Sequence, residues 1–230
     1  MTLRRLFGDA TAAEGARVAL DPEARKHVKV LRLSPGTPVE LFDGEGHLAE
    51  AELLEGGGVR IVRSWVAEPA LPHTTLVWAL PKAPAVELGI RMATELGVDA
   101  IRLALGERSP AEPSAKKVER WRRIAREATR QCERPTTPDL LGPRPFAEAA
   151  RTDAELRLAA LARTDATEPV ATAAASVAVA IGPEGGFTDA ERALLEELGY
   201  LPLALGPHVL RSDTAVVAAL AGIQRRGAIG

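Results

Sequence analysis

The spacing of apolar residues changes near residue 70, and this change restricts the chain to folds with two differently built parts. Before it, three short segments alternate apolar and polar side chains, which is typical of β-strands. They are residues 38–42, 48–54 and 59–65. Glycine-containing segments at 43–46 and 55–58 separate them and predict hairpin turns. Because a small antiparallel barrel hides strand edges, we expect one within residues 1–70.

Helix-like patterns occur in both parts of the chain. A short helix is expected between Asp21 and Leu33, with Asp21 as N-cap and Pro22 in its first turn. After a proline-containing break at 68–72, strand-like and helix-like segments alternate. The expected strands are 76–80, 100–105, 156–161, 177–181 and 201–205, and the expected helices are 85–96, 114–133, 189–198 and 213–225. This alternation predicts an α/β domain over residues 71–230, with a mostly parallel sheet covered on both faces.

Composition excludes several classes of protein. Hydrophobic residues make up 46% and charged residues 26%, so a disordered chain is not expected, and a net charge of −2 excludes a generally basic protein. A single cysteine, Cys132, leaves no disulfide within one chain. The four histidines are scattered without metal-ligand spacing, so we expect no metal site. With no apolar run behind the N-terminal arginines and none near the ~20 residues of a spanning helix, we expect a cytoplasmic protein without a signal peptide.

A glycine-rich turn between a strand and a helix is the most informative segment. Residues 181–188 read IGPEGGFT, and Thr188 and Glu191 have the spacing of a capping box. Ligands of parallel α/β sheets bind beyond the carboxyl ends of strands, so this turn is a candidate binding loop. It lacks the lysine of a Walker A loop and the spacing of GxGxxG, which disfavours polyphosphates and dinucleotides. The alternative is a tight turn that binds nothing.

The segment 203–215, LALGPHVLRSDTA, repeats this arrangement of strand, Gly-Pro turn and helix. Arg211 precedes the helix directly, and its alternative interpretation is a surface arginine near a helix cap. The helix that follows is rich in alanine and valine. Small side chains allow close backbone packing, which suits either a tight core or a subunit interface.

Two segments are locally basic. Residues 102–134 hold ten Lys or Arg and five Asp or Glu, and residues 25–32 hold four cations and one histidine without an acidic residue. Each is either a solvated amphipathic helix or a surface for RNA phosphates. The candidate RNA-binding residues are Arg25, Lys26, His27, Lys29, Arg32, Arg108, Lys116, Arg123, Arg130 and Arg134. Cys132 falls on the apolar face of the second helix, so we expect it in the core.

Five segments together resemble a known family. IGPEGGFTDAE (181–191) and LGPHVLRSDTA (205–215) are similar to the two C-terminal signatures of the RsmE family, the 16S ribosomal RNA uracil-N3 methyltransferases of the SPOUT superfamily. KHVKVLRL (26–33), MATELGVDAIRLALGERS (92–109) and RWRRIAREATRQCERPTTPDL (120–140) resemble three further family segments. The similarity covers nearly the whole chain in the same order.

The resemblance implies a PUA-like barrel followed by a SPOUT methyltransferase domain with a deep trefoil knot. It also implies S-adenosylmethionine as methyl donor, a homodimer, and one uridine near the 3′ end of the small-subunit RNA as target. Carried over by position, the cofactor-binding residues are Leu80, Gly182, Glu184, Gly185, Leu205, Gly206 and Leu210. His208 and Asp213 stand where the family more often has Arg and Glu.

The implied reaction suggests roles for two side chains. Uracil N3 must lose its proton before it attacks the methyl group, so a cation that stabilises the uracil anion and a base are required. Arg211 is the candidate cation and Glu184 the candidate base, with Asp213 as a further possibility for the base. The alternatives are a SPOUT methyltransferase that acts on another RNA, and an RNA-binding ribosome assembly factor without catalysis.

Overall fold

The computed structural model describes residues 3–69, 72–82, 85–161 and 174–227, with side chains described up to residue 223. The chain divides into two compact units. The first unit is Met1–Pro69 with Arg126–Thr137, and the second unit is Ala70–Ala125 with Pro138–Gly230. The boundary expected between residues 70 and 71 lies outside the described residues.

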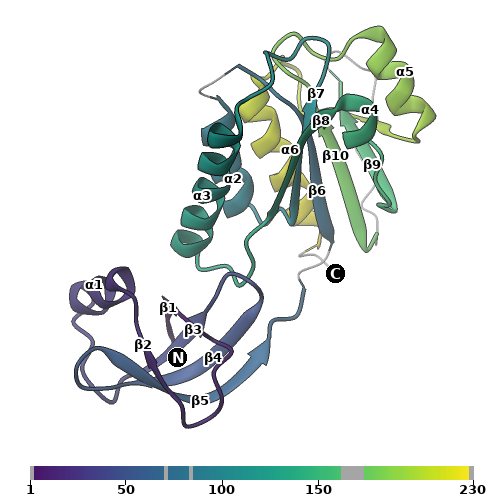
Figure 1. Ribbon diagram of the computed structural model, residues 1–230. Helices are drawn as coiled ribbons and strands as arrows, with labels where there is room; N and C mark the ends of the chain where they lie inside the picture. Colours follow the sequence, from purple (N-terminus) through teal and green to yellow (C-terminus); the bar gives the residue numbers. More distant parts are fainter. Residues whose placement is uncertain (1–2, 70–71, 83–84, 162–173, 228–230) are drawn as a thin grey trace. The chain divides into compact units, whose positions relative to one another are not determined.

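The first unit is built on a five-stranded sheet in the order β1-β3-β4-β5-β2 (Figure 1). Its strands are β1 Arg4–Phe7, β2 Arg17–Ala19, β3 Pro38–Phe42, β4 His47–Leu53 and β5 Gly58–Val66. The antiparallel pairs β3–β4 and β4–β5 are the predicted hairpins. β1 pairs with β3 in parallel, which departs from an all-antiparallel arrangement. Strands as short as β1 and β2 carry too few alternations to be recognised from sequence.

The core of the first unit lies between this sheet and helix α1, Pro22–Val30. Asp21 is its N-cap, as predicted, and Asp21 Oδ1 accepts a hydrogen bond from the backbone N–H of Ala24 at 2.7 Å. Only Ala24 of α1 is buried. The core side chains include Leu6, Leu20, Val39, Leu41, Leu53, Val59 and Ile61. The cationic side chains of α1 are therefore left at the surface.

The second unit contains a six-stranded sheet in the order β11-β9-β10-β6-β7-β8, and every neighbouring pair is parallel. Its strands are β6 His73–Ala79, β7 Ala100–Leu105, β8 Asp139–Pro145, β9 Leu156–Ala160, β10 Ser176–Ile181 and β11 Leu201–Leu203. The predicted parallel sheet is confirmed. β8 was missed because its sequence, DLLGPRP, contains glycine and two prolines.

Helices cover both faces of this sheet, as predicted (Figure 1). On one face α2 (Ala85–Glu95), α3 (Ala115–Cys132) and α6 (Ser212–Gly227) share a core with Trp78 and Leu103 of the strands. On the other face α4 (Phe146–Ala149) and α5 (Asp189–Glu197) pack on alanines of β10. No helix within these described ranges is both long and apolar enough to cross a membrane.

One polar residue joins distant parts of the second unit. Ser212, at the start of α6, is buried, and its Oγ donates to the carbonyl of Gly182 at 2.7 Å. The same Oγ accepts a hydrogen bond from Trp78 Nε1 at 2.9 Å. The segment after β11 is therefore held against the ends of β6 and β10.

The expected position of Cys132 is wrong. Val118, Trp121, Ala125 and Ala128 are buried along one face of α3, as the helical spacing predicted, but Cys132 is exposed. It is the last residue of α3, and Thr129, one turn earlier, is the last fully buried position of the helix. Helical spacing identifies a face but not the point along the helix at which packing ends.

Candidate active site

A cavity of about 670 Å³ opens where β9, β10 and β11 end. Its walls are the ends of these strands and the loops that follow β10 and β11, as expected for a ligand site in such a sheet. The lining residues are Ala160, Leu161, Ile181–Phe187, Arg192, Leu203–Leu210, Ser212 and Ala215. The volume falls in the ~300–1,000 Å³ range of small-molecule sites.

The first wall is the loop of residues 182–188, here called the glycine loop. Its turn is closed by a hydrogen bond from the N–H of Gly186 to the carbonyl of Pro183 at 2.8 Å, and Gly186 has φ of +69°. A side chain at Gly182 would lie 3.3 Å from the backbone of Gly186. Thr188 then begins α5 with the predicted capping box, in which Thr188 and Glu191 bond each other's backbone N–H groups.

The second wall is the loop of residues 204–211. Gly206 has φ of +125°, a backbone conformation that other residues rarely adopt. Leu205 and Leu210 are partly buried against the core of the second unit, so both ends of the loop are anchored. Ser212, which directly follows this loop, donates a hydrogen bond to the carbonyl of Gly182 and so joins the end of the loop to the glycine loop. The cavity is thus formed by two loops that the fold ties together.

The structure brings together six of the seven residues expected at the cofactor site. They are Gly182, Glu184, Gly185, Leu205, Gly206 and Leu210, and all line the cavity. Leu80 is buried next to the end of β6, and it is not among the lining residues. Its N–H donates to the carbonyl of Ala104, which ties the end of β6 to β7.

The candidate catalytic side chains differ in their surroundings. Glu184 lines the cavity, and its Oε2 accepts a hydrogen bond from the N–H of Lys82 at 3.3 Å. Arg211 lies between two lining residues, yet its side chain is 77% exposed, with Nε 3.9 Å from Asp213 Oδ1. Asp213 itself is buried. Arg211 is therefore exposed to solvent beside the cavity, at ion-pair distance from Asp213.

Arg192 was missed in the sequence. It lines the cavity one helical turn after the N-cap Thr188. The spacing of four from Thr188 is the signal that predicts it on the same side of α5. With Glu184 and His208, it is one of three ionisable side chains among the described lining residues.

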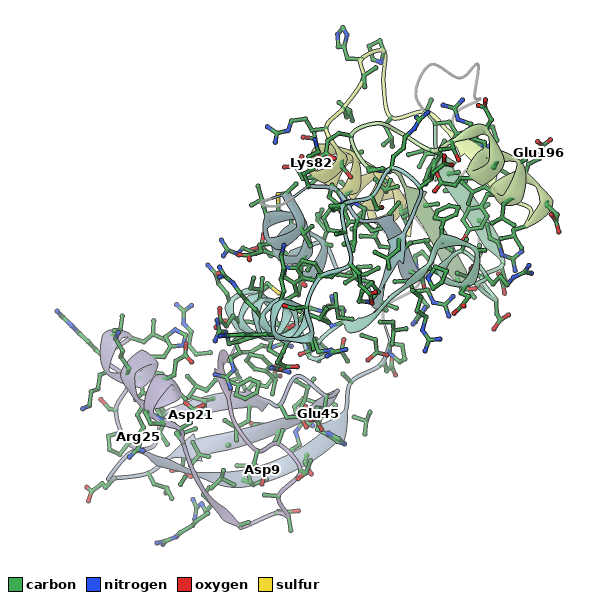
Figure 2. All side chains as sticks on the ribbon, turned by 45° about the horizontal axis from the view of Figure 1, so that its top comes forward. Asp9, Asp21, Arg25, Glu45, Lys82 and Glu196 are labelled. Carbon is green, nitrogen blue, oxygen red and sulfur yellow. The ribbon has the colours of Figure 1, made fainter. Side chains whose placement is uncertain are left out.

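The candidate RNA-binding residues fall on both units. In the first unit Arg25, Lys26, His27, Lys29 and Arg32 are all exposed on or just after α1, and Figure 2 labels Arg25 there. In the second unit Arg108, Lys116 and Arg123 are exposed. Arg130 and Arg134 belong to the part of the chain grouped with the first unit.

Arg130 has partners within the first unit. Its guanidinium is 2.9 Å from Glu23 Oε2 and 3.9 Å from Asp21 Oδ2, and it lies 3.9 Å from the centre of the Phe7 ring. These contacts tie the last turn of α3 to α1 and β1. Arg130, on α3, therefore has a structural role within the first unit. Within the described ranges, no three His, Cys, Asp or Glu side chains gather as metal ligands would.

The sequence and the fold both match known proteins. Residues 68–224 match an RNA methyltransferase domain family, and residues 20–61 match an RNA methyltransferase PUA domain family. A ribosomal RNA small subunit methyltransferase E from Mycobacterium bovis is 32% identical over 97% of this chain and 92% of its own length. The chain belongs to this methyltransferase family.

Further members of the family agree. The Synechocystis relative of the same name is 37% identical over 85% of this chain and 68% of its own length. The Neisseria gonorrhoeae enzyme of that name, solved with S-adenosyl methionine, has a TM-score of 0.81 and 27% identity, and covers 97% of this chain and 98% of that chain. A methyltransferase from Legionella pneumophila, also solved with bound cofactor, has a TM-score of 0.76 and 30% identity, with 98% of each chain covered.

Proposed function

We propose that this family member transfers the methyl group of S-adenosylmethionine to N3 of one uridine in 16S ribosomal RNA of the small ribosomal subunit. The observation that carries the proposal is the cavity between the glycine loop and residues 204–211, in a chain whose relatives are ribosomal RNA methyltransferases. The two solved relatives with bound cofactor support the choice of methyl donor. Since the proposed substrate is ribosomal RNA, we also propose that the reaction takes place in the cytoplasm.

The cavity has the chemistry that the cofactor requires. Ile181, Leu205 and Leu210 supply apolar surface for an adenine ring, and the glycines bring backbone N–H and C=O groups to the wall. Glu184 adds a negative charge, which suits the sulfonium and ammonium groups of the cofactor. We therefore assign Gly182, Glu184 and Gly185 in one loop, and Leu205, Gly206 and Leu210 in the other, to cofactor binding. Leu80 supports this site from behind, by holding the end of β6.

In the proposed mechanism the chain supplies charge and position. When bound, the cofactor supplies an electrophilic methyl group. Arg211, exposed beside the cavity, stabilises the negative charge that develops on the uracil ring as N3 loses its proton. Glu184 accepts that proton, and Asp213 orients Arg211. Since N3 lies on the Watson–Crick edge, the uridine must be unpaired to reach these groups.

We also propose that the cationic residues of α1 and α3 bind RNA phosphates, and that the enzyme acts as a homodimer. We propose with it a division into a PUA-like RNA-binding part over residues 1–70 and a methyltransferase part over 71–230. A catalytic Arg211 that is 77% exposed needs a further surface to exclude water, and RNA together with a second subunit would provide it. Sedimentation equilibrium tests the dimer.

The deciding experiment is methyl transfer from labelled S-adenosylmethionine to 30S subunits from cells that lack the corresponding gene. N3-methyluridine at one position is the expected product. A different methylated nucleoside would indicate a SPOUT enzyme with another RNA target. Cofactor binding without transfer to subunits or naked RNA would indicate an assembly factor.

The variant Arg211→Ala tests the catalytic assignment. Because the Arg211 side chain is 77% exposed and is not among the lining residues, methyl transfer should fall by about 100-fold or more while cofactor affinity stays nearly unchanged. Arg17→Ala, an exposed arginine on β2, is the control and should transfer normally. Equal losses of transfer and of cofactor binding in Arg211→Ala would contradict the catalytic role.

A further inference from the structure

A second loop of the same unit is fastened to the glycine loop. Residues 106–109 follow β7 and belong to none of the strands that end at the cavity. The buried carboxylate of Glu191 bonds both loops. Its Oε2 accepts from the N–H of Thr188 at 2.8 Å, and its Oε1 accepts from the N–H of Glu107 at 2.9 Å. The Glu191 side chain thus caps α5 and also binds the loop of residues 106–109.

The approach of the two loops depends on Gly106. A Cβ added to Gly106 would lie 2.5 Å from Glu191 Oε1, so any other residue would push the carboxylate away from the Glu107 N–H. The backbone of Gly106 lies outside the left-handed region that favours glycine, so the requirement is for space and not for conformation. Ser109 completes the turn, since its Oγ accepts from the N–H of Gly106 at 3.1 Å.

A second contact joins the loops on the side of the cavity. The guanidinium of Arg108 donates a hydrogen bond to the carbonyl of Gly185, which is a lining residue. Arg108 is exposed, so the same side chain is also accessible to a phosphate. Residues 106–109 are thus tied to the glycine loop by Glu191 at one point and by Arg108 at another.

We propose that Glu191 is a positioning residue that couples cofactor binding to RNA binding. The proposal rests on the proposed function, in which the glycine loop holds the cofactor and Arg108 contacts RNA. Each oxygen of Glu191 serves one of the two loops, so a ligand that orders one loop also favours the bound arrangement of the other. By linkage, each ligand then raises the affinity for the other by the same factor.

The test measures this factor directly. Affinity for labelled S-adenosylhomocysteine, which does not allow turnover, is measured by equilibrium dialysis with and without saturating 30S subunits. Wild-type protein should bind at least about fivefold more tightly with subunits, the low end of usual coupling between sites. In Glu191→Gln one of the two N–H groups loses its acceptor, and the ratio should fall close to one.

Two further variants separate coupling from general damage. Gly106→Ala displaces the Glu191 carboxylate by a substitution in the loop 106–109 and not in α5. The affinity ratio should again fall close to one. Glu196→Gln, at an exposed position of α5 labelled in Figure 2, is the matched control and should keep it. Ratios that persist in both Glu191→Gln and Gly106→Ala would overturn the proposal.

The same preparation distinguishes this proposal from the proposed function. Wild-type protein that methylates 30S subunits but shows a ratio of one would overturn only the coupling. Wild-type protein that binds neither cofactor nor subunits would overturn both. A ratio above one without methyl transfer would support the coupling and contradict the catalytic function.

Discussion

At the scale of single residues, Arg192 carries the charge that the sequence interpretation overlooked. It lines a cavity whose proposed ligand has two cationic groups and one carboxylate. A guanidinium is repelled by the sulfonium and the ammonium, and attracted by the carboxylate. We therefore expect Arg192 to face the carboxylate of the cofactor, and Glu184 to face its cationic groups.

The prediction compares two ligands that differ only in this group. Arg192→Gln should weaken S-adenosylmethionine binding about threefold to fivefold, the range for a partly solvated ion pair. It should leave binding of decarboxylated S-adenosylmethionine unchanged. Isothermal titration calorimetry measures both, with Arg17→Gln as control. An equal loss for the two ligands would show that Arg192 does not meet the carboxylate.

At the scale of elements, one helix approaches its sheet through a glycine. A Cβ on Gly89 of α2 would lie 2.2 Å from the Trp78 ring, whereas one on Gly222 of α6 would meet nothing within 4 Å. Alanine normally stabilises a helix by about 0.5–1 kcal/mol relative to glycine. Overpacking of a core costs about 1–3 kcal/mol. At Gly89 this cost exceeds the gain that alanine brings to the helix.

The two glycines should therefore respond in opposite directions. Gly89→Ala should lower the free energy of unfolding by about 1–2 kcal/mol, while Gly222→Ala should raise it by about 0.5–1 kcal/mol. Urea unfolding followed by circular dichroism measures both. If Gly89→Ala proved as stable as wild type, the close packing of α2 on Trp78 would be wrong.

Tyr200 links the segment after α5 to α4. Burial raises the pKa of its phenol above the ordinary value of 10.0, and its hydroxyl donates to the carbonyl of Ala150 at 2.8 Å. The contribution of this hydrogen bond is fully present below pH 10.0. Above that pH the unfolded chain ionises first, so the contribution is lost as pH rises through the raised pKa.

Tyr200→Phe should accordingly cost about 1 kcal/mol near neutral pH. The difference in unfolding free energy from wild type should shrink as pH rises above 10.0, because only the wild type has a phenol to ionise. Urea unfolding at several pH values measures the difference. A difference that stays constant across this range would show that the phenol is not protected from ionisation.

At the scale of the whole molecule, charge is unevenly distributed. The net charge is −2, while residues 102–134 alone carry +5. A protein that binds RNA phosphates displaces the cations bound to the RNA. Because this release is less favourable at high salt, RNA affinity falls steeply as salt rises. Lys116 and Arg130 lie on the same helix. Arg130, however, forms ion pairs with Glu23 and Asp21 and a cation–π contact with Phe7.

Binding to 30S subunits should therefore show a steep salt dependence. Lys116→Gln should reduce the slope of log affinity against log salt by about one, without loss of stability. Arg130→Gln should mainly lower the stability of the first unit. Filter binding over a salt series, with urea unfolding alongside, measures both effects. A flat salt response of the wild type would contradict phosphate binding by these residues.

Most of the longer helices and strands were readable from the sequence, whereas β1, β2, β8 and α4 were not. Alternation of apolar residues predicted β3, β4 and β5 to within about a residue. Asp21 and Thr188 marked helix starts because capping is a local interaction between a side chain and nearby backbone. The glycine loop and residues 204–211 were recognised for the same reason, since their turns depend on residues next to each other in the chain.

Contacts between distant segments were decided only by the tertiary structure. The bonds of Ser212 to Trp78 and of Glu191 to Glu107 join residues far apart in sequence. No spacing rule links such pairs, because they meet only after the strands have taken their order in the sheet. The exposure of Cys132 and the partners of Arg130 have the same origin. Local side-chain chemistry therefore determined the elements and the binding loops, and packing between them decided which side chains are buried, paired or free to act.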